Sequence, residues 1–310
     1  MSTAELELQV EPLLTTEAES QFRVIWKRFR RHKLAMAGIV IIAFFIAMAI
    51  LAPFVAPYDP IRYQDLTNTN APPSAEHPLG TDKIGRDILS RLMFGASISL
   101  TVAFTVVLMS ETFGSILGAI SGFYGGRVDN LVQRVTDFML SLPLLPMLLA
   151  VSAIFKDQFA IPGLPREWNS AALIIVVLTV FGWMGACRLV RGQVLSLRNQ
   201  DFTEAARALG VGNRRIILRH MIPNSLPPII VNATLALGGV IVIESALSFL
   251  TFGVQPPVPT WGNMLADYQA ELWSEPVKVF FPGLSIFLCA LAFNYIGDGL
   301  RDALDPRLKR

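Results

Sequence analysis

Two carboxylates lie inside long apolar stretches, where an acidic side chain is rare. Glu111 is the single charged residue in residues 95–124, and Glu244 is the single charged residue in residues 227–252. A charge in lipid is costly, so such residues face a bundle interior or a water-filled cavity. We therefore expect Glu111 and Glu244 either to line a pathway or to form structural hydrogen bonds between helices. Neither stretch contains a His or Lys partner, so a proton relay is not supported.

The sequence lacks the motifs of common catalytic and metal sites. The nucleotide-binding pattern G-x-x-x-x-G-K-[ST] does not occur, and neither do H-E-x-x-H, C-x-x-C or G-x-S-x-G. His32, His77 and His220 are scattered outside the apolar stretches. Cys187 and Cys289 lie inside them, where a thiol behaves as a small hydrophobe. We expect this chain to have no catalytic residue, no metal site and no bound cofactor.

The polar stretch 199–224 lies between two long apolar runs and predicts two short helices. Asp201 and Glu204 have the spacing of a capping box at the start of the first helix, and Gly210 supplies a left-handed stop after it. Pro223 ends the second helix. The first helix carries apolar residues suited to close docking: Ala205, Ala206 and Leu209. These residue types favour docking on a partner over chemistry.

The same stretch also has the pattern of a DNA-binding helix-turn-helix, with Arg214 and Arg215 at the start of the second helix. Such motifs are surrounded by an apolar three-helix core, whereas the neighbours here are apolar runs long enough to cross a bilayer. The net charge is only +2. We therefore expect no nucleic-acid partner. A purely structural amphipathic loop remains the alternative at this point.

The composition predicts an all-α integral membrane protein. Hydrophobic residues make up 53% of the 310 residues and charged residues only 16%, against about 25% in soluble domains. A span needs about 20 apolar residues. Six stretches meet this requirement approximately, and they are residues 34–58, 95–124, 138–155, 168–187, 227–252 and 279–297. Pro143 and Pro146 are expected to kink the third.

The regions outside the spans complete the predicted organisation. Residues 1–33 form a tail that is acidic at first and then basic, and residues 59–94 form a loop with an interfacial helix at 81–94. Residues 95–300 form a five-helix core that includes 199–224, and residues 301–310 form the second tail. A cleaved signal peptide is the competing interpretation of 34–58, but the run is longer than a signal h-region.

Small residues recur every four positions in the second span, and the series is Ser110, Gly114, Gly118 and Gly122. Residues at this spacing share one helix face, and small side chains let two helix backbones approach closely in lipid. We predict that this ridge packs against another helix.

The distribution of Lys and Arg fixes the expected orientation. Most of the 26 basic residues fall in the first tail, in the loops around 123–134 and 188–219, and in the last tail. The positive-inside rule therefore places both termini and the stretch 199–224 on the cytoplasmic side of the membrane.

Three segments together resemble a known family. Glu204-Ala205-Ala206, then Gly210, then Pro223 thirteen residues later, is similar to the EAA loop of the membrane subunits of binding-protein-dependent ABC importers. PLGTDKIGRDILSRLMFGASISL and the terminal GDGLRDALDPRLKR resemble segments of the dipeptide, oligopeptide and nickel permeases. The resemblance covers residues 27–309. It implies the transmembrane-domain fold of a type I ABC importer.

The resemblance also implies partners and roles. The EAA loop would couple to cytoplasmic ATPases through Asp201, Glu204, Ala205, Ala206, Leu209, Gly210 and Pro223. The partners would be a homologous second permease subunit, two ABC ATPase subunits that hold ATP and Mg²⁺, and a periplasmic or lipid-anchored substrate-binding protein. The location would be the bacterial inner membrane, with residues 59–94 in the periplasm. The chain would form half of a pathway for di- or oligopeptides.

Other cargoes and one other class of transporter remain open. Close members of the resembled branch carry nickel chelates, glutathione and other small solutes, and specificity rests largely with the separate binding protein. A self-sufficient secondary transporter should show inverted repeats and half-helices around ligands at the membrane midplane. No such repeat is present, and Gly238-Gly239 near Glu244 is the nearest feature.

Overall fold

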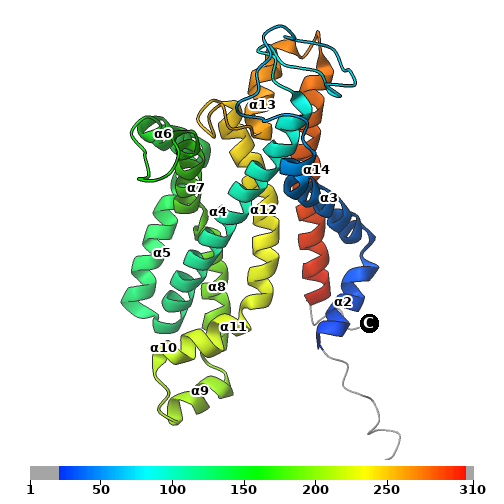
Figure 1. Ribbon diagram of the computed structural model, residues 1–310. Coiled ribbons are helices and arrows are strands. Elements are labelled where there is room, and N and C mark those ends of the chain that lie inside the picture. Colours follow the sequence, from blue (N-terminus) through cyan, green and yellow to red (C-terminus); the bar gives the residue numbers. More distant parts are fainter. Residues whose placement is uncertain (1–20, 305–310) are drawn as a thin grey trace, which may run out of the picture.

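The computed structural model describes residues 21–304, which form helices and connecting loops with no β-strand (Figure 1). A single isolated bridge joins Thr81 to Asp87. The helices are α2 (Gln21–Arg31), α3 (Lys33–Val55), α4 (Ile88–Tyr124), α5 (Gly126–Ser141), α6 (Leu144–Phe155), η2 (Arg166–Trp168), α7 (Asn169–Gly182), α8 (Met184–Leu197), α9 (Asp201–Ala208), α10 (Asn213–Ile216), η3 (Ile217–Met221), α11 (Ile222–Asn224), α12 (Leu226–Phe249), α13 (Trp261–Tyr268), η4 (Gln269–Glu271) and α14 (Pro276–Leu304).

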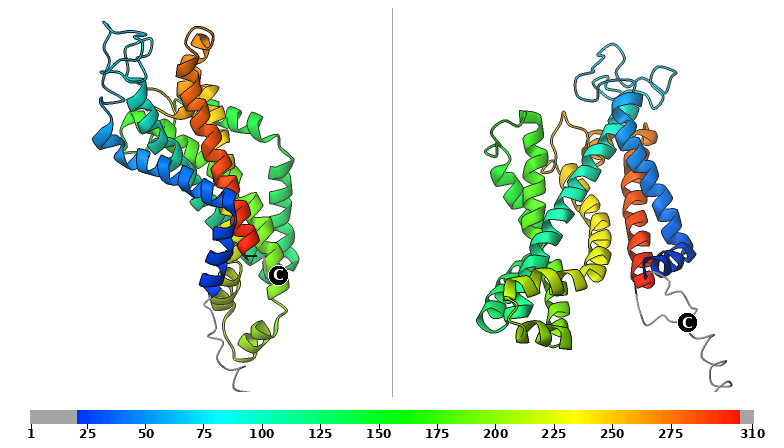
Figure 2. Two further views of the ribbon diagram at one scale, coloured as in Figure 1. Left: turned by 90° about the vertical axis from the view of Figure 1, so that its right-hand side faces the viewer. Right: turned by 60° about the horizontal axis from the view of Figure 1, so that its bottom comes forward.

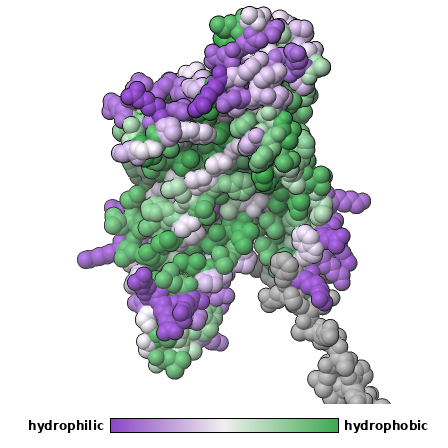
Figure 3. Space-filling model, viewed as in Figure 1, coloured by the Kyte–Doolittle hydropathy of each residue, from purple (hydrophilic) through white to green (hydrophobic). Residues whose placement is uncertain are grey.

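The described helices confirm the predicted six-span, all-α membrane architecture. Five segments are long and apolar enough to cross a bilayer, namely α3, α4, the run η2–α7–α8, α12 and α14. The pair α5–α6 makes the sixth if it is counted as one bent span. Space-filling Figure 3 shows an apolar band between hydrophilic ends on the face in view. That distribution suits a protein surrounded by lipid at its middle.

The expected interfacial helix at 81–94 is wrong. Residues 81–87 are not helical, and α4 starts at Ile88 and runs without a break into the second span. Asp87 caps α4, because its Oδ2 accepts a hydrogen bond from the backbone N–H of Ser90 at 2.7 Å. Gly85, with φ +74°, turns the chain just before the cap. The apolar positions Ile88 and Leu92 are buried in the core of the bundle.

The third and fourth spans differ from the expected ranges. The expected loop around 123–134 is largely helical, because α5 begins at Gly126. The expected span 138–155 is broken between α5 and α6, which meet at a bend of 89°. Pro143 stands at the break as the residue before α6, which confirms the expected kink there. The fourth span also has a break, at Trp183, and extends to Leu197.

The main apolar core lies between α3, α4, α12, α13 and α14. Its fully buried members include Ile88, Ala96, Ile241 and Trp261. Trp261 begins α13, and its indole N–H donates to the Leu92 carbonyl at 3.2 Å. This contact ties the loop after α12 to the first turns of α4. The core therefore joins both ends of the sequence into one bundle.

The two ends of the described chain lie together at one end of the bundle. In Figure 1, and in the turned views of Figure 2, α2 lies beside the last turns of α14. Phe29 of α2 is buried against Ala303 and its neighbours. The predicted tails at 1–33 and 301–310 are therefore partly helical, because residues 21–31 form α2 and α14 continues to Leu304. Residues 1–20 and 305–310 lie outside the described residues.

Candidate functional site

The predicted docking segment forms a compact unit at one end of the molecule. Helices α9 to α11 lie at the end where α2 lies, and the loops before α4 and around α13 lie at the opposite end (Figure 1). Ala206, Ile216 and Met221 are buried against Val190 and Val194 of α8 and the last turns of α4. The short helices are thus packed directly onto two of the spans.

The predicted capping box of α9 is wrong. The N-cap is Gln200, whose carbonyl accepts from the N–H groups of Thr203 and Glu204 at 2.8 and 3.2 Å, and no side chain caps the helix. Asp201 is the first residue of α9. Both carboxylates stand in the first turn, where the helix dipole favours negative charge.

The predicted stop at Gly210 is confirmed. Its φ is +75°, a conformation that favours glycine. The Gly210 N–H donates to the Arg207 carbonyl at 2.9 Å, and the Val211 N–H donates to the Ala206 carbonyl at 3.0 Å. This pair of bonds is the Schellman pattern, which satisfies carbonyls at the helix end. Helix α9 is consequently short and well defined at its end.

One face of α9 is left open. Thr203 and Ala206 are buried, so Ala206, which was predicted to be a coupling residue, packs against its own chain instead. Exposed residues recur at helical spacing, namely Asp201, Glu204, Ala205 and Ala208, and Arg207 beside them is also exposed. Leu209 follows them with 83% of its surface exposed. The open face combines two carboxylates, two small side chains and one projecting apolar side chain. Such a face fits a groove on a partner that has basic residues at its rim and an apolar pocket.

The second short helix has an irregular backbone before Pro223. Residues Ile217–Met221 form a turn of π-helix, and Pro223 lies exposed within α11 just after it. Proline lacks an N–H, and its ring clashes with a carbonyl one turn earlier in an α-helix. A widened turn relieves that clash. Pro223 therefore marks the passage from the docking segment into α12, although the helix continues to Asn224 before α12 begins.

The predicted small-residue ridge is confirmed, and its partner is α8. A Cβ added to Gly114 would lie 2.3 Å from the Trp183 carbonyl oxygen, and one added to Gly118 would lie 2.3 Å from the Cys187 carbonyl oxygen. Two further pairs extend the contact, Gly122 with Arg191 and Ser110 with Gly182. Helix α4 therefore packs backbone to backbone against α7 and α8. Because α8 leads directly into α9, the ridge connects the docking segment to the second span.

Glu111 lines an apolar groove between α4 and α11–α12. The groove measures about 430 Å³, and its walls include Phe104, Leu108 and Ile229. Oε1 of Glu111 accepts a hydrogen bond from the amide of Asn232 at 2.6 Å. Oε2 of Glu111 and the hydroxyl of Ser115, one turn further along α4, are buried and have no partner among residues 21–304. Two unpaired polar atoms thus lie on one helix face beside an apolar surface.

Glu244 has a different setting from the one predicted for a pathway. Its side chain is fully buried. Ser248 donates to Oε1 at 2.8 Å, and the hydroxyls of Ser99 and Ser245 lie 3.4 Å from Oε2. The carboxylate is enclosed within this chain, so in this geometry it links α4 to α12 and lines no open groove. Of the two predicted pathway residues, the structure places only Glu111 at a groove.

The opposite end of the molecule is a lobe built from residues 56–87 and 250–275, which we call the outer lobe. Arg86 joins its two parts by donating to Asp82 at 2.5 Å and to Asp267 at 2.8 Å. Burial alone would lower the pKa of Arg86, but the two carboxylates raise it above its usual value. Burial raises the pKa of the neighbouring Tyr268 hydroxyl, so this group stays neutral. The outer lobe is therefore held by the Arg86 guanidinium, which bonds to a carboxylate from each of its two parts.

Two functional candidates were missed by sequence reasoning. Asn232 and Ser115 complete the polar group around Glu111, yet neither was singled out. The signal for Asn232 was available, because an amide inside an apolar run usually bonds to another helix. Its partner lies 121 residues away in sequence and was not predictable from spacing.

Within residues 21–304 there is no group of His, Cys, Asp and Glu that could hold a metal ion.

Comparison with known protein families gives two matches. Residues 114–310 match the family described as binding-protein-dependent transport system inner membrane component. Residues 20–73 match the N-terminal TM domain of oligopeptide transport permease C. The two matched regions contain α2 and α3 at the start, and the docking segment and all later spans at the end.

Individual relatives align over almost the whole chain. It is 43% identical over 96% of its length to the dipeptide transport system permease protein DppC of Alkalihalophilus pseudofirmus, of which 98% is covered. It is 39% identical over 92% of its length to the oligopeptide transport system permease protein OppC of Bacillus subtilis, of which 91% is covered. It is 38% identical over 97% of its length to the glutathione transport system permease protein GsiD of Escherichia coli, of which 96% is covered.

Proposed function

Since the chain belongs to the family of binding-protein-dependent transport system inner membrane components, we propose that it forms half of an ATP-driven import pathway for short peptides. It is an integral membrane permease subunit of an ABC importer. The observation that carries the proposal is the open face of α9, presented on a segment packed against α4 and α8. ATP and Mg²⁺ belong to partner subunits in this proposal, since the sequence has no P-loop.

The coupling residues act as one docking surface. Asp201 and Glu204 meet basic groups on an ATPase subunit, Ala205 allows close approach, and Leu209 enters an apolar pocket. Gly210 and Pro223 fix where the docking helix ends and where the chain re-enters the bundle. When the ATPases close on nucleotide, α9 moves with them. The backbone contact of α8 with α4 carries that movement into the spans.

The complete importer has four further parts. A homologous second permease subunit forms the other half of the pathway, two ATPase subunits bind the docking segments, and a periplasmic or lipid-anchored binding protein delivers cargo. Both termini and α9 face the cytoplasm of a bacterial cell, and the outer lobe faces the binding protein. The positive-inside distribution of Lys and Arg supports this orientation.

Peptide is the proposed cargo because two of the relatives above are named for dipeptide and oligopeptide transport. The relative named for glutathione transport keeps a small tripeptide-like solute as the second candidate. The test is ATP hydrolysis by the reconstituted importer with its cognate binding protein, titrated with dipeptides, longer peptides, glutathione and nickel chelates. Stimulation by peptides alone supports the proposal. Stimulation by another class alone overturns the cargo and leaves the importer mechanism standing.

The groove at Glu111 is the proposed part of the pathway within this chain. Its unpaired Oε2 is an acceptor for a hydrogen-bond donor, and every peptide with a free amino terminus carries an ammonium group. The apolar walls suit side chains of varied shape. In this proposal Asn232 holds the carboxylate in place, and Ser115 offers a second polar contact.

Coupling has its own test. Substitution Glu204→Lys reverses the charge at the exposed docking face and leaves the buried side of α9 untouched, so the complex should remain in the membrane and lose peptide uptake. Uptake and ATP hydrolysis are measured in proteoliposomes. The matched control is Glu167→Lys, which makes the same change at an exposed position on the opposite side. Normal uptake by the Glu204 variant would rule out the docking assignment.

A further inference from the structure

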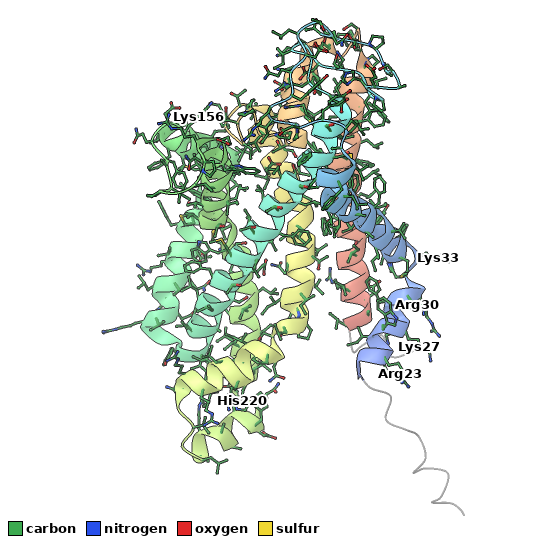
Figure 4. The ribbon with its side chains drawn as sticks, in the orientation of Figure 1. Arg23, Lys27, Arg30, Lys33, Lys156 and His220 are labelled. Atoms are coloured by element: carbon green, nitrogen blue, oxygen red, sulfur yellow. The ribbon has the colours of Figure 1, made fainter. Side chains whose placement is uncertain are left out.

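The short helix α2 carries only positive charge. From Gln21 to Tyr58 the sequence has six basic residues and no acidic one. The basic residues include Arg23, Lys27 and Arg30, whose spacing of four and then three positions puts them on one face of an α-helix. Figure 4 shows these three and Lys33 on the outer side of the chain, away from α14. The result is a cationic stripe along the outside of α2 and the start of α3.

The opposite face of α2 is fixed to the bundle. Phe29 is only 3% exposed, and it packs with Ile25 against Ala303 and Leu300 of α14. A Cβ added to Gly299 would lie 2.4 Å from the Cβ of Ala35, so the corner between α2 and α3 sits directly on the α14 backbone. Because this packing is tight, α2 cannot rotate its cationic stripe toward the protein.

The position of the stripe along the membrane normal follows from the first span. Helix α3 is a candidate span that starts at Lys33, and only His32 separates it from the end of α2. Eleven residues of helix measure about 16 Å, so α2 reaches no further than that from the start of the span. The polar headgroups and the surface potential beyond them, which falls off over about 8–10 Å, cover most of this distance.

Trp26 provides an independent mark of the same position. It is 46% exposed on α2 and stacks on Phe29, with ring centroids 6.0 Å apart. Tryptophan is enriched at membrane–water interfaces, where its ring lies at the level of the headgroups. An exposed tryptophan next to a row of cations is the composition of an interfacial helix.

Three of the four labelled cations of the stripe have no ion pair within the described chain. Lys27, Arg30 and Lys33 are exposed, and none has an ion pair with residues 21–304. By contrast, Arg86 in the outer lobe and Lys278 in the first turn of α14 are buried and paired. From the one-sided charge, the depth and the exposed tryptophan, we propose that the stripe on α2 is a binding site for anionic phospholipid headgroups of the cytoplasmic leaflet.

The site has a consequence for the bundle. Helix α14, on which α2 is fixed, contributes Arg301 and Leu304 to a cavity of about 780 Å³ that also includes Asn232. Asn232 is the residue that holds Glu111. Helix α2, which carries the proposed lipid site, therefore packs on the helix that forms one wall of that cavity.

The experiment uses the complete importer in nanodiscs that contain phosphatidylcholine and a minor fraction of spin-labelled phosphatidylglycerol. The test variant is Lys27→Gln/Arg30→Gln/Lys33→Gln. The matched control is Arg62→Gln/Lys156→Gln/Arg166→Gln, which removes the same number of exposed charges on the other side. A third variant, Lys27→Arg/Lys33→Arg, changes the residues and keeps the charge.

We expect the preference for phosphatidylglycerol over phosphatidylcholine to fall about tenfold or more in the test variant, because each cation near the surface contributes separately. The control and the charge-conserving variant should keep the wild-type preference. ATP hydrolysis of the wild type should respond to added phosphatidylglycerol, and the test variant should not.

Three outcomes would overturn the proposal. An unchanged lipid preference in the test variant would show that the stripe does not contact headgroups. An equal loss in the control would show a general effect of net charge. Loss of ATPase subunits with lipid preference retained would assign the stripe to a protein partner. Since lipid binding is measured without peptide, failure here is separate from failure of the proposed transport function.

Discussion

Glu111 and Ser115 leave two buried polar atoms without partners on one face of α4, beside an apolar groove. Unpaired buried groups of this kind cost stability, so their presence at a groove favours a role in binding. We predict that Glu111→Gln lowers peptide uptake at least several-fold while the complex still assembles, because glutamine keeps the size and the Asn232 contact and removes the negative charge.

Uptake of a labelled peptide in proteoliposomes checks this prediction, with assembly followed by size-exclusion chromatography. The control is Glu244→Gln. Glu244 is enclosed by three serine hydroxyls, so its substitution should lower stability before it changes cargo selectivity. Wild-type uptake by the Glu111 variant would remove this residue from the pathway.

The contact between α4 and α8 can be tested by adding a single methyl group at Gly118. A Cβ here would lie 2.3 Å from the Cys187 carbonyl oxygen, so the helices must separate to admit it. We predict that Gly118→Ala destabilises the protein by about 1–3 kcal/mol, the usual cost of overpacking. Gly192, in α8, has no atom within 4 Å of its added Cβ. Gly192→Ala should therefore be neutral or stabilising by up to about 1 kcal/mol.

The midpoint of thermal unfolding is measured for both variants with a thiol-reactive dye. Cys187 and Cys289 are fully buried, so they react with the dye only when the bundle opens. An equal midpoint for Gly118→Ala and wild type would contradict the close packing.

Glu111 and Glu244 show what could be known about single residues from the sequence. Both are isolated carboxylates in apolar runs, so the sequence predicts the same two alternative roles for each of them. Their settings differ because of residues on other helices: Asn232 lies 121 positions from Glu111, and Ser99 lies 145 positions from Glu244. Sequence spacing does not report such pairs. The small-residue ridge was predictable because its four members lie on one helix and their function depends on their size alone.

At the scale of elements, α9 presents its apolar end residue to solvent. Leu209 is 83% exposed, so its side chain adds little to the stability of the folded chain, and in the proposed function it serves docking. We predict that Leu209→Ala weakens binding of the ATPase subunits about tenfold or more, as expected for an apolar anchor, and leaves thermal stability unchanged. The measurement is copurification of ATPase subunits with tagged permease, followed by a binding titration.

The matched control is Leu66→Ala, which makes the same change at a position 73% exposed in the outer lobe. Reduced binding in both variants, or in neither, would contradict the role given to Leu209.

The elements themselves were predictable to different degrees. Long apolar runs gave α3, α12 and α14 with small errors at their ends, because length and hydropathy are enough to define a span. The break between α5 and α6 followed from the prolines, but its 89° bend did not. The prediction of an interfacial helix was wrong because its apolar positions, such as Ile88, are buried in the main core. The helix also begins later than predicted, because Asp87 is its N-cap. The capping box failed since Gln200, one residue earlier, closes the first turn with its carbonyl.

For the whole molecule, the course of α5 and α6 determines which ends share a side of the membrane. If the bent pair is one span, three crossings separate the outer lobe from α9, and the two lie on opposite sides. If the pair were only a re-entrant loop, two crossings would remain, and residues 56–87 would lie on the same side as α9. Helix α12 would then place residues 250–275 on the other side, although Arg86 bonds to Asp267 and holds the two parts of the outer lobe together. In Figure 1, α5 rises from the end of α4 near α9 toward the end where the outer lobe lies. That course favours the full crossing.

Cysteine labelling tests this topology directly. The two native cysteines are buried, so engineered ones dominate the signal. We predict that Leu209→Cys and Lys27→Cys react with a membrane-impermeant maleimide in inverted vesicles and are protected in intact spheroplasts, whereas Leu66→Cys does the reverse. Lys27 serves as the internal control, because only α3 separates it from the outer lobe under either topology. If Leu209→Cys and Leu66→Cys reacted from the same side, α5–α6 would not cross the membrane. The docking face of α9 could then not meet ATPases on the cytoplasmic side while the outer lobe met a periplasmic binding protein.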